Sequence, residues 1–203
     1  MNIGIIGTGN MGTGLAKHWA KAGHSIMFGS REPDRARAAA AAIGGGAQGG
    51  TQEAAAAFGE VVLLATPWNA TRALAQSLPL DGKIVIDCTN DLSPTRAETT
   101  VGTAQEVAQW ARGARVVKAF NTVFFQILHA EQISGERGTV FIVGDDAAAK
   151  SVVGGLIRDA GFEPFDAGGL KNAHYIDRLA ALIVELGYGQ GHGKNIAYKL
   201  LRL

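Results

Sequence analysis

The chain lacks the features that would tie it to a disulfide framework, a nucleic acid or a membrane. Cys88 is the single cysteine among 203 residues, which excludes an internal disulfide and favours a reducing, cytoplasmic location. The net charge of +1 offers no basic surface for nucleic acid or anionic lipid. No uninterrupted apolar run reaches about 18 residues and no basic leader precedes the first apolar stretch, so neither a membrane span nor a secretory signal is expected.

Metal ligands and aromatic residues are also scarce. The five histidines and one cysteine show no ligand spacing, so no metal site is expected. Aromatic residues make up 7% of the chain, whereas glycine occurs 28 times and alanine is frequent. This composition favours helices packed closely on a sheet over a β-sandwich.

Short apolar segments alternate with helical segments along most of the chain. Continuous apolar runs such as residues 2–7 (NIGIIG) are typical of parallel strands that are buried on both faces. Strands separated by helices require right-handed crossovers. The pattern therefore predicts an α/β fold: a Rossmann-type, doubly wound, mostly parallel sheet with a short C-terminal helical extension. Strands are expected at 2–7, 25–28, 47–49, 61–65, 83–87, 115–119, 140–143 and 162–165, and helices at 10–22, 33–42, 51–58, 68–77, 102–110, 146–160, 171–186 and 196–201.

A glycine-rich turn directly follows the first expected strand. Residues 7–12 read Gly-Thr-Gly-Asn-Met-Gly, a G-x-G-x-x-G pattern between a strand and a helix. Gly7 permits the tight turn, Gly9 lets the backbone approach a pyrophosphate, and Gly12 lets the helix pack closely on the strand. The N-terminus of the helix offers free N–H groups to the phosphates. The motif predicts a dinucleotide site.

The end of the second expected strand indicates which dinucleotide binds. NAD sites usually carry an acidic residue there, which accepts hydrogen bonds from the ribose 2′-OH. In this chain Ser30 can donate to a 2′-phosphate and Arg31 can pair with it. Arg35, one helical turn later, either adds a second positive charge or is a solvated surface residue. NADP(H) is favoured, although Glu32 or Asp34 can also face the ribose.

Three further strand ends are expected to line the nicotinamide side of the cleft, because open α/β sheets bind ligands at the carboxyl ends of their strands. Asn121 is placed to offer an amide to the cofactor or the acceptor, and Lys118 is interpreted as a solvated strand residue. Trp68 either forms a wall with Pro67 against the nicotinamide ribose or packs at the start of a helix. The cofactor-binding residues expected at these ends are Ala65, Thr66, Pro67, Asn90, Ala119 and Asn121.

No convincing catalytic pair of acid and base is visible in the sequence. His174 and Tyr175 stand near the start of the last long helix, where either can protonate an imine or carbonyl substrate or serve a capping or interface role. Asn121 is the third candidate. The catalytic residues therefore stay unassigned.

The C-terminal part of the chain is expected to be organised separately. Residues 1–168 are expected to form an NADP-binding Rossmann domain, and residues 169–203 a helical segment that completes the cleft. The last long helix carries an apolar stripe that either packs in the core or forms a dimer seam, and a homodimer is expected. The stripe consists of Ile176, Leu179, Ala180, Ile183 and Leu186.

Five segments, in their order and spacing, carry a resemblance to a known family. They read MNIGIIGTGNMG, GSR, LLATPW, VVKAFNT and FEPFDAGGLKNA, and together they span nearly the whole chain. In these segments the chain resembles NADPH-dependent coenzyme F-420 (F420) reductases and is similar to the cytoplasmic domain of the six-transmembrane ferric reductases. The opening motif is shared by many dehydrogenases, whereas VVKAFNT and PFDAGGL are specific to this group.

The resemblance implies hydride exchange between NADP(H) and a flavin-type acceptor, which can be coenzyme F420, FMN or FAD. Such chemistry depends on the alignment of two rings more than on acid–base residues. The block at Asn121 reads AFNT, closer to the ferric-reductase type than to the archaeal deazaflavin reductases, so the donor is better defined than the acceptor. Carried over by position, Thr8, Asn10 and Met11 hold the pyrophosphate, Ser30 and Arg31 the 2′-phosphate, and Thr66 and Pro67 the nicotinamide end.

Two alternatives remain open. The first twelve residues look equally like pyrroline-5-carboxylate reductase, which would make the chain an NADPH-dependent imine or carbonyl reductase of a small molecule. That family, however, has a longer helical C-terminal domain. The second alternative is a non-catalytic NADP(H) sensor, which would bind the cofactor without passing hydride to any acceptor.

Overall fold

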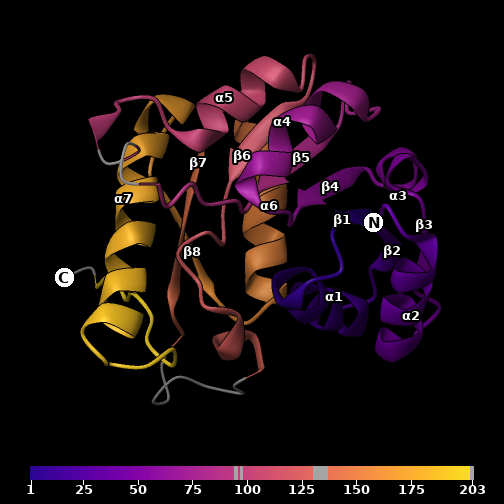
Figure 1. The fold of residues 1–203 in the computed structure, drawn as a ribbon, viewed down its shortest axis with the longest axis horizontal. Coiled ribbons are helices and arrows are strands. Elements are labelled where there is room, and N and C mark those ends of the chain that lie inside the picture. The colour runs from indigo at the N-terminus through magenta and orange to yellow at the C-terminus, as the bar shows by residue number, and fades with distance from the viewer. Residues whose placement is uncertain (94–95, 97, 130–136, 202–203) are drawn as a thin grey trace.

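The computed structural model of the chain describes residues 1–93, 96, 98–129 and 137–201. Within these residues the strands form one eight-stranded sheet in the order β3-β2-β1-β4-β5-β6-β7-β8 (Figure 1). β1 lies between β2 and β4, so the chain crosses to the opposite half of the sheet after β3, as in doubly wound folds. The strands are β1 (Asn2–Ile6), β2 (Ser25–Gly29), β3 (Gln48–Gly50), β4 (Val61–Leu64), β5 (Ile84–Asp87), β6 (Arg115–Lys118), β7 (Thr139–Gly144) and β8 (Glu163–Asp166).

Helices cover both faces of the sheet because alternate strand residues point to opposite faces. Ile3 and Ile5 of β1 join a cluster with α1, α2 and α6, whereas Ile6 joins a second cluster with α3, α4 and α5. No helix in the described part of the chain is long and apolar enough to span a membrane. The helices are α1 (Asn10–Lys21), α2 (Pro33–Ile43), α3 (Gln52–Phe58), α4 (Trp68–Ser77), α5 (Thr103–Trp110), α6 (Ala147–Asp159) and α7 (Ala173–Val184), with short helical turns η2 (Phe125–His129), η3 (Leu170–Asn172) and η4 (Glu185–Gly189).

The sheet is parallel except at the junction of β6 and β7. Those two strands are antiparallel and share two residue pairs, Val117 with Gly144 and Lys118 with Val143. β8 then pairs with β7 in parallel. Because the overlap with β6 is so short, β7 and β8 continue past the carboxyl end of β6. The expected mostly parallel, Rossmann-type sheet is confirmed.

The prediction of a helix at residues 196–201 is wrong. The segment is non-helical and follows β7: the Thr139 N–H donates to the Tyr198 carbonyl at 2.7 Å, and the Leu200 N–H donates to Thr139 Oγ1 at 3.0 Å. Six residues are too few to sustain an isolated helix. The first part of β7 has no β6 neighbour, so its backbone needs another partner, and the tail provides one.

The helix expected at 171–186 is divided into three parts. The 3₁₀ turn η3 precedes α7, and the π-helical turn η4 follows it. Ile176, Ala180 and Ile183 of the apolar stripe are buried in the chain's own core, and Leu179 and Leu186 are half-buried. The stripe therefore packs mainly within this chain.

Candidate functional site

The strand ends expected to carry the site meet at one edge of the sheet. Ile6 of β1 is in register with Gly29 of β2 and with Leu64 of β4. Leu64 is in turn opposite Asp87 of β5, which is opposite Lys118 of β6. We call this line of strand ends the carboxyl edge. The structure therefore brings together along it the expected residues Gly7, Thr8, Gly9, Ser30, Ala65, Thr66, Pro67, Asn90, Ala119 and Asn121.

The turn between β1 and α1 fits an anionic ligand. Gly7 has a φ of +117°, and a Cβ there would lie 2.3 Å from the Ala65 carbonyl oxygen, so only glycine is accommodated. Gly9 is the N-cap of α1, without a side-chain cap, and a Cβ on it would meet no atom within 4 Å. The first turn of α1 has no acidic residue. Its free N–H groups therefore face open space that suits a phosphate group.

The remaining residues of the motif flank this turn. Asn10 is exposed at the start of α1, and Thr8 and Met11 are half-buried. Gly12 is buried against the turn. Thr13 was not expected in the site, yet its hydroxyl donates to the Gly9 carbonyl at 3.1 Å and so holds the turn.

The end of β2 carries Ser30 and Arg31, the two residues expected to bind a 2′-phosphate. The Ser30 hydroxyl oxygen accepts the Glu32 N–H at 3.1 Å. The Glu32 carboxylate pairs with Arg35 at 3.3 Å along the first turn of α2. Arg31 is exposed and has no ion-pair partner in the described part of the chain. Ser30 and Arg31 are thus available to a 2′-phosphate, whereas the charge of Arg35 is shared with Glu32.

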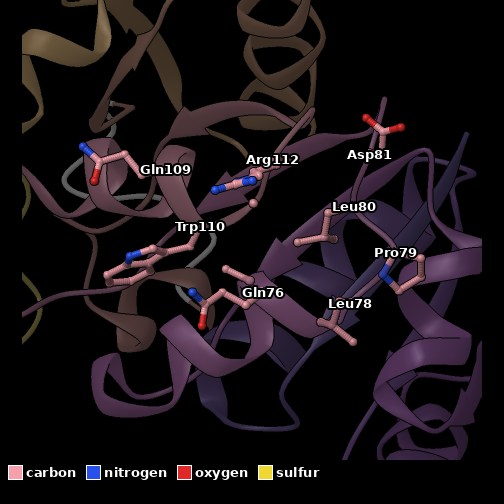
Figure 2. Close-up of a pocket in the computed structure, with 10 residues that line it drawn as sticks. Gln76, Leu78, Pro79, Leu80, Asp81, Gln109, Trp110 and Arg112 are labelled. Atoms are coloured by element: carbon pink, nitrogen blue, oxygen red, sulfur yellow. The ribbon is translucent and has the colours of Figure 1, made fainter.

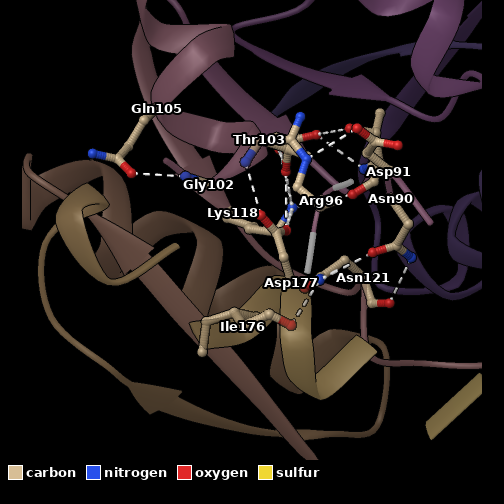
Figure 3. Close-up of polar contacts among 12 residues, drawn as sticks. Asn90, Asp91, Arg96, Gly102, Thr103, Gln105, Lys118, Asn121, Ile176 and Asp177 are labelled. Atoms are coloured by element: carbon tan, nitrogen blue, oxygen red, sulfur yellow. Dashed lines mark hydrogen bonds and ion pairs between the residues drawn. The ribbon is translucent and has the colours of Figure 1, made fainter. Parts of the chain in front are cut away.

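Trp68 packs at the start of α4, the second of the two alternatives that the sequence left open. Its ring centroid lies 5.3 Å from that of Trp110 on α5, and the Arg96 guanidinium lies 5.2 Å above the Trp68 ring. Arg96 is itself held by the carboxylates of Asp91 at 3.0 Å and Glu106 at 2.6 Å (Figure 3). The segment after β5 is therefore pinned against the start of α4, a contact that sequence reasoning missed.

Asn90 and Asn121 form a reciprocal pair at the ends of β5 and β6 (Figure 3). Asn90 Nδ2 donates to the Asn121 carbonyl at 2.9 Å, and Asn121 Nδ2 donates to Asn90 Oδ1 at 3.2 Å and to the Ile176 carbonyl at 3.3 Å. Asn121 is 5% exposed, and its Oδ1 has no hydrogen-bond donor among the described residues. A buried acceptor without a donor is energetically costly, so this oxygen is a candidate ligand contact.

The backbone turns sharply just before Asn121. Phe120 has a φ of +65°, and no other non-glycine residue in the described ranges has a positive φ. Such a conformation is strained for a bulky side chain, and strained residues of this kind cluster at functional sites. Phe120 is fully buried against Trp19 of α1, with ring centroids 6.0 Å apart. Packing against the dinucleotide helix thus helps to hold the strained turn.

The interpretation of Lys118 as a solvated residue is wrong. Its side chain is fully buried, with Nζ 3.2 Å from the Asp87 carboxylate and 2.9 Å from that of Asp177 (Figure 3). Burial alone lowers the pKa of Lys118, but the two carboxylates outweigh burial and raise the pKa above its ordinary value. The ammonium therefore stays charged. Both acidic partners come from distant parts of the chain, so no local pattern revealed them.

His174 and Tyr175 form a local contact of their own. His174 Nδ1 lies 2.9 Å from the Lys171 carbonyl, which can only accept, so Nδ1 carries the proton. The two rings are 3.9 Å apart, and Tyr175 is 56% exposed. Both residues lie in the first turn of α7. Their role as proton donors stays a prediction.

A groove of about 360 Å³ lies elsewhere, between the ends of α4 and α5 (Figure 2). It is lined by residues that precede β5 and β6, among them Leu80, Asp81 and Arg112, together with Gln76 and Trp110. These positions are at the amino ends of the strands, on the opposite edge of the sheet from the glycine turn. The groove is therefore separate from the carboxyl edge.

A doubly wound sheet with a glycine turn at its first crossover defines a Rossmann-type dinucleotide-binding protein. The family model described as NADP oxidoreductase coenzyme F420-dependent matches residues 2–91. The F420-dependent NADP reductase of Methanothermobacter thermautotrophicus is 30% identical over 207 residues, which cover 92% of this chain and 89% of that protein. The chain belongs to this family and is an NADP-dependent oxidoreductase, as the resemblance implied.

Two further relatives agree with this assignment. Metalloreductase STEAP3 of Rattus norvegicus is 32% identical over 177 residues, which cover 87% of this chain but 36% of that longer protein. A crystal structure from Arthrobacter sp. FB24, provisionally assigned as an F420-dependent NADP-reductase, superposes with a TM-score of 0.86 at 25% identity. That match covers 98% of this chain and 99% of the Arthrobacter chain.

Proposed function

We propose that the chain transfers hydride between NADP(H) and a flavin-type ring, with coenzyme F420, FMN and FAD as the candidate acceptors. One observation carries the proposal: within the described residues, Asp87 and Lys118 at the ends of β5 and β6 are buried and paired with each other, and Lys118 pairs also with Asp177. Among the described residues, the ends of β5 and β6 therefore offer contacts for a dinucleotide but no accessible acid–base pair. Ring-to-ring hydride transfer needs alignment and no proton donor from the protein, which suits such an edge.

Different residues of the carboxyl edge would bind different parts of NADP(H). The N-terminus of α1 and the backbone at Gly9 bind the pyrophosphate, and Ser30 and Arg31 bind the 2′-phosphate. Thr66 and Pro67 lie at the nicotinamide end, and Asn121 Oδ1 accepts an amide N–H there. When bound, NADPH supplies the hydride, and these side chains hold its donor in place.

The proposed donor site is tested by replacing Arg31. A charge-assisted hydrogen bond contributes about 1.5–3 kcal/mol, so Arg31→Ala should raise the KM for NADPH at least about ten-fold and leave the KM for NADH unchanged. Arg37→Ala is the matched control, because Arg37 is also exposed on α2 but pairs with Asp34 at 2.6 Å. Equal KM values for NADPH in wild type and Arg31→Ala would contradict the assignment.

The acceptor is tested by following the loss of NADPH absorbance with FMN, FAD, riboflavin and coenzyme F420 in turn. Rapid oxidation with one of these rings supports the proposal. If NADPH binds but no ring oxidises it, the flavin-type acceptor is wrong. A panel of imines and carbonyl compounds then decides between a small-molecule reductase and an NADP(H) sensor.

A further inference from the structure

Four buried side chains from four elements meet beneath the Asn90–Asn121 pair. Asp87 ends β5, Lys118 ends β6, Thr103 begins α5, and Asp177 lies in the second turn of α7. Asp177 is 6% exposed, and the other three are fully buried. We call this set the buried ion network (Figure 3). Its members Asp87 and Lys118 are themselves strand-end residues of the carboxyl edge.

Every polar group of the network has a partner. Lys118 Nζ contacts the Thr103 hydroxyl at 2.5 Å and the Thr89 carbonyl at 3.1 Å, besides both carboxylates. Asp87 Oδ1 accepts the Thr89 N–H at 2.9 Å, and Asp177 Oδ2 accepts the Thr103 N–H at 2.8 Å. A fully satisfied, buried polar network is rigid, because each directional bond fixes its neighbours.

The network controls the backbone that carries the asparagine pair. Asp87 and Lys118 hold Thr89, the residue before Asn90, through its N–H and its carbonyl. Lys118 itself lies three residues before Asn121, whose amide donates to the carbonyl of Ile176, next to Asp177. α7 is thus tied to the end of β6 twice, on either side of the strained Phe120.

Stability alone does not account for this arrangement. Replacing a buried ion pair by well-packed apolar residues is often neutral or stabilising. Apolar contacts, however, tolerate small shifts, whereas these hydrogen bonds fix directions. A charged network in the core is therefore better explained by a role in positioning the neighbouring residues than by a contribution to the stability of the fold.

We propose that Lys118, acting through Asp87, Thr103 and Asp177, is a positioning residue that sets the Asn90–Asn121 pair and thereby the nicotinamide end of bound NADP(H). Lys118 does not contact the cofactor. The inference rests on the proposed function, since it assumes that Asn121 contacts the nicotinamide end. It predicts that weakening the network misaligns hydride transfer without weakening the distant phosphate contacts.

Isosteric variants test the proposal. Thr103→Val removes the hydroxyl and keeps the shape, whereas Thr103→Ser keeps the hydroxyl. Asp177→Asn replaces one of two accepting oxygens by a donor that opposes the Thr103 N–H or the Lys118 ammonium. Thr139→Val is the matched control, because Thr139 is also buried and hydrogen-bonded but holds the C-terminal tail.

The expected result is a separation of kcat from KM. Thr103→Val and Asp177→Asn should lower kcat about ten-fold or more while the KM for NADPH changes less than about two-fold. The deuterium isotope effect on kcat, measured with NADPH labelled at the transferred position, should rise. Thr103→Ser should restore wild-type kcat, and Thr139→Val should lower the Tm alone. If Thr103→Val leaves kcat unchanged, or if kcat falls only with the folded fraction, the network is merely structural.

A second measurement separates this inference from the proposed function. The fluorescence of bound NADPH reports the surroundings of the nicotinamide without any acceptor. Thr103→Val should bind NADPH with wild-type affinity but with an altered emission. If wild type passes hydride to none of the ring acceptors, the proposed function is wrong. The emission of NADPH bound to wild type and to Thr103→Val still tests the positioning role in that case. Identical emission in both proteins would overturn the positioning role.

Discussion

Arg31 and Lys118 carry the same charge in opposite environments. Arg31 stands exposed after β2, where a short local motif predicts a phosphate contact. Lys118 also ends a strand, but β5 and β7 flank it and its carboxylate partners lie on β5 and α7. The surroundings of Lys118 depend on the meeting of distant elements and could not be predicted from the local sequence, whereas the phosphate contact of Arg31 stays a prediction.

The ion pair between Asp166 and Lys150 gives a pH dependence that can be measured. Partial burial alone raises the pKa of Asp166, but the Lys150 ammonium and the Gly168 N–H outweigh it, so the pKa lies below its ordinary value. A depressed carboxyl pKa stabilises the fold above the unfolded pKa of about 3.9, and the contribution is lost as the pH falls below that value.

Asp166→Asn should therefore lower the Tm by about 2 °C near pH 7 and by almost nothing near pH 2, since such pairs contribute up to about 1 kcal/mol. Thermal unfolding followed by circular dichroism at both pH values checks this. Asp34→Asn is the control, because Asp34 is 92% exposed in its pair with Arg37 and should change the Tm at neither pH. If Asp166→Asn lowers the Tm more near pH 2 than near pH 7, the direction of the Asp166 pKa shift is wrong.

Elements with a strong apolar pattern were predicted within a few residues, whereas the structure of the C-terminal tail was not predicted. β1, β4 and β5 are continuous apolar runs whose burial on both faces decides their structure. The tail at 196–201 has helix-forming residues, but the unpaired edge of β7 captures it. Tertiary hydrogen bonding overrides local propensity in a segment that short.

Replacing two glycines, Gly102 and Gly155, by alanine should change the free energy of unfolding in opposite directions. A Cβ at Gly102, the N-cap of α5, would lie 2.5 Å from the Cβ of Ala173 and from the His174 nitrogen. Gly155 lies inside α6, where a Cβ would meet nothing within 4 Å. Gly155→Ala should raise the free energy of unfolding by about 0.5–1 kcal/mol, whereas Gly102→Ala should lower it by about 1–3 kcal/mol.

Urea unfolding of both variants measures these differences. Gly102→Ala has a second expected effect, because α5 and α7 would have to separate and the Thr103–Asp177 contact would lengthen. A stabilised Gly102→Ala would mean that the two helices are not held as closely as the structure has them.

At the scale of the whole molecule, the apolar stripe of α7 packs mainly in the core, but another face of α7 is exposed. Tyr175 and Leu182 are 56% and 48% exposed. They are seven residues apart, so they lie on the same side of the helix. If the homodimer predicted from the sequence forms, we expect it to use this face rather than the stripe, because Ile176, Ala180 and Ile183 of the stripe are already buried.

Leu182→Glu should then convert a dimer into a monomer, since a buried unpaired charge is costly. Size-exclusion chromatography with light scattering measures the mass of each variant. Leu92→Glu serves as the control, because Leu92 is 53% exposed but lies in the loop after β5. If the wild-type protein is a monomer, the prediction of a homodimer is wrong.

The groove between α4 and α5 has a consequence for inhibitor discovery. It opens at the amino edge of the sheet, and the whole length of the strands separates it from the glycine turn. A fragment that binds there stabilises the fold in a thermal-shift screen without displacing NADPH. Such fragments would show noncompetitive kinetics or no inhibition at all, so screening against this enzyme should pair melting shifts with competition for the dinucleotide.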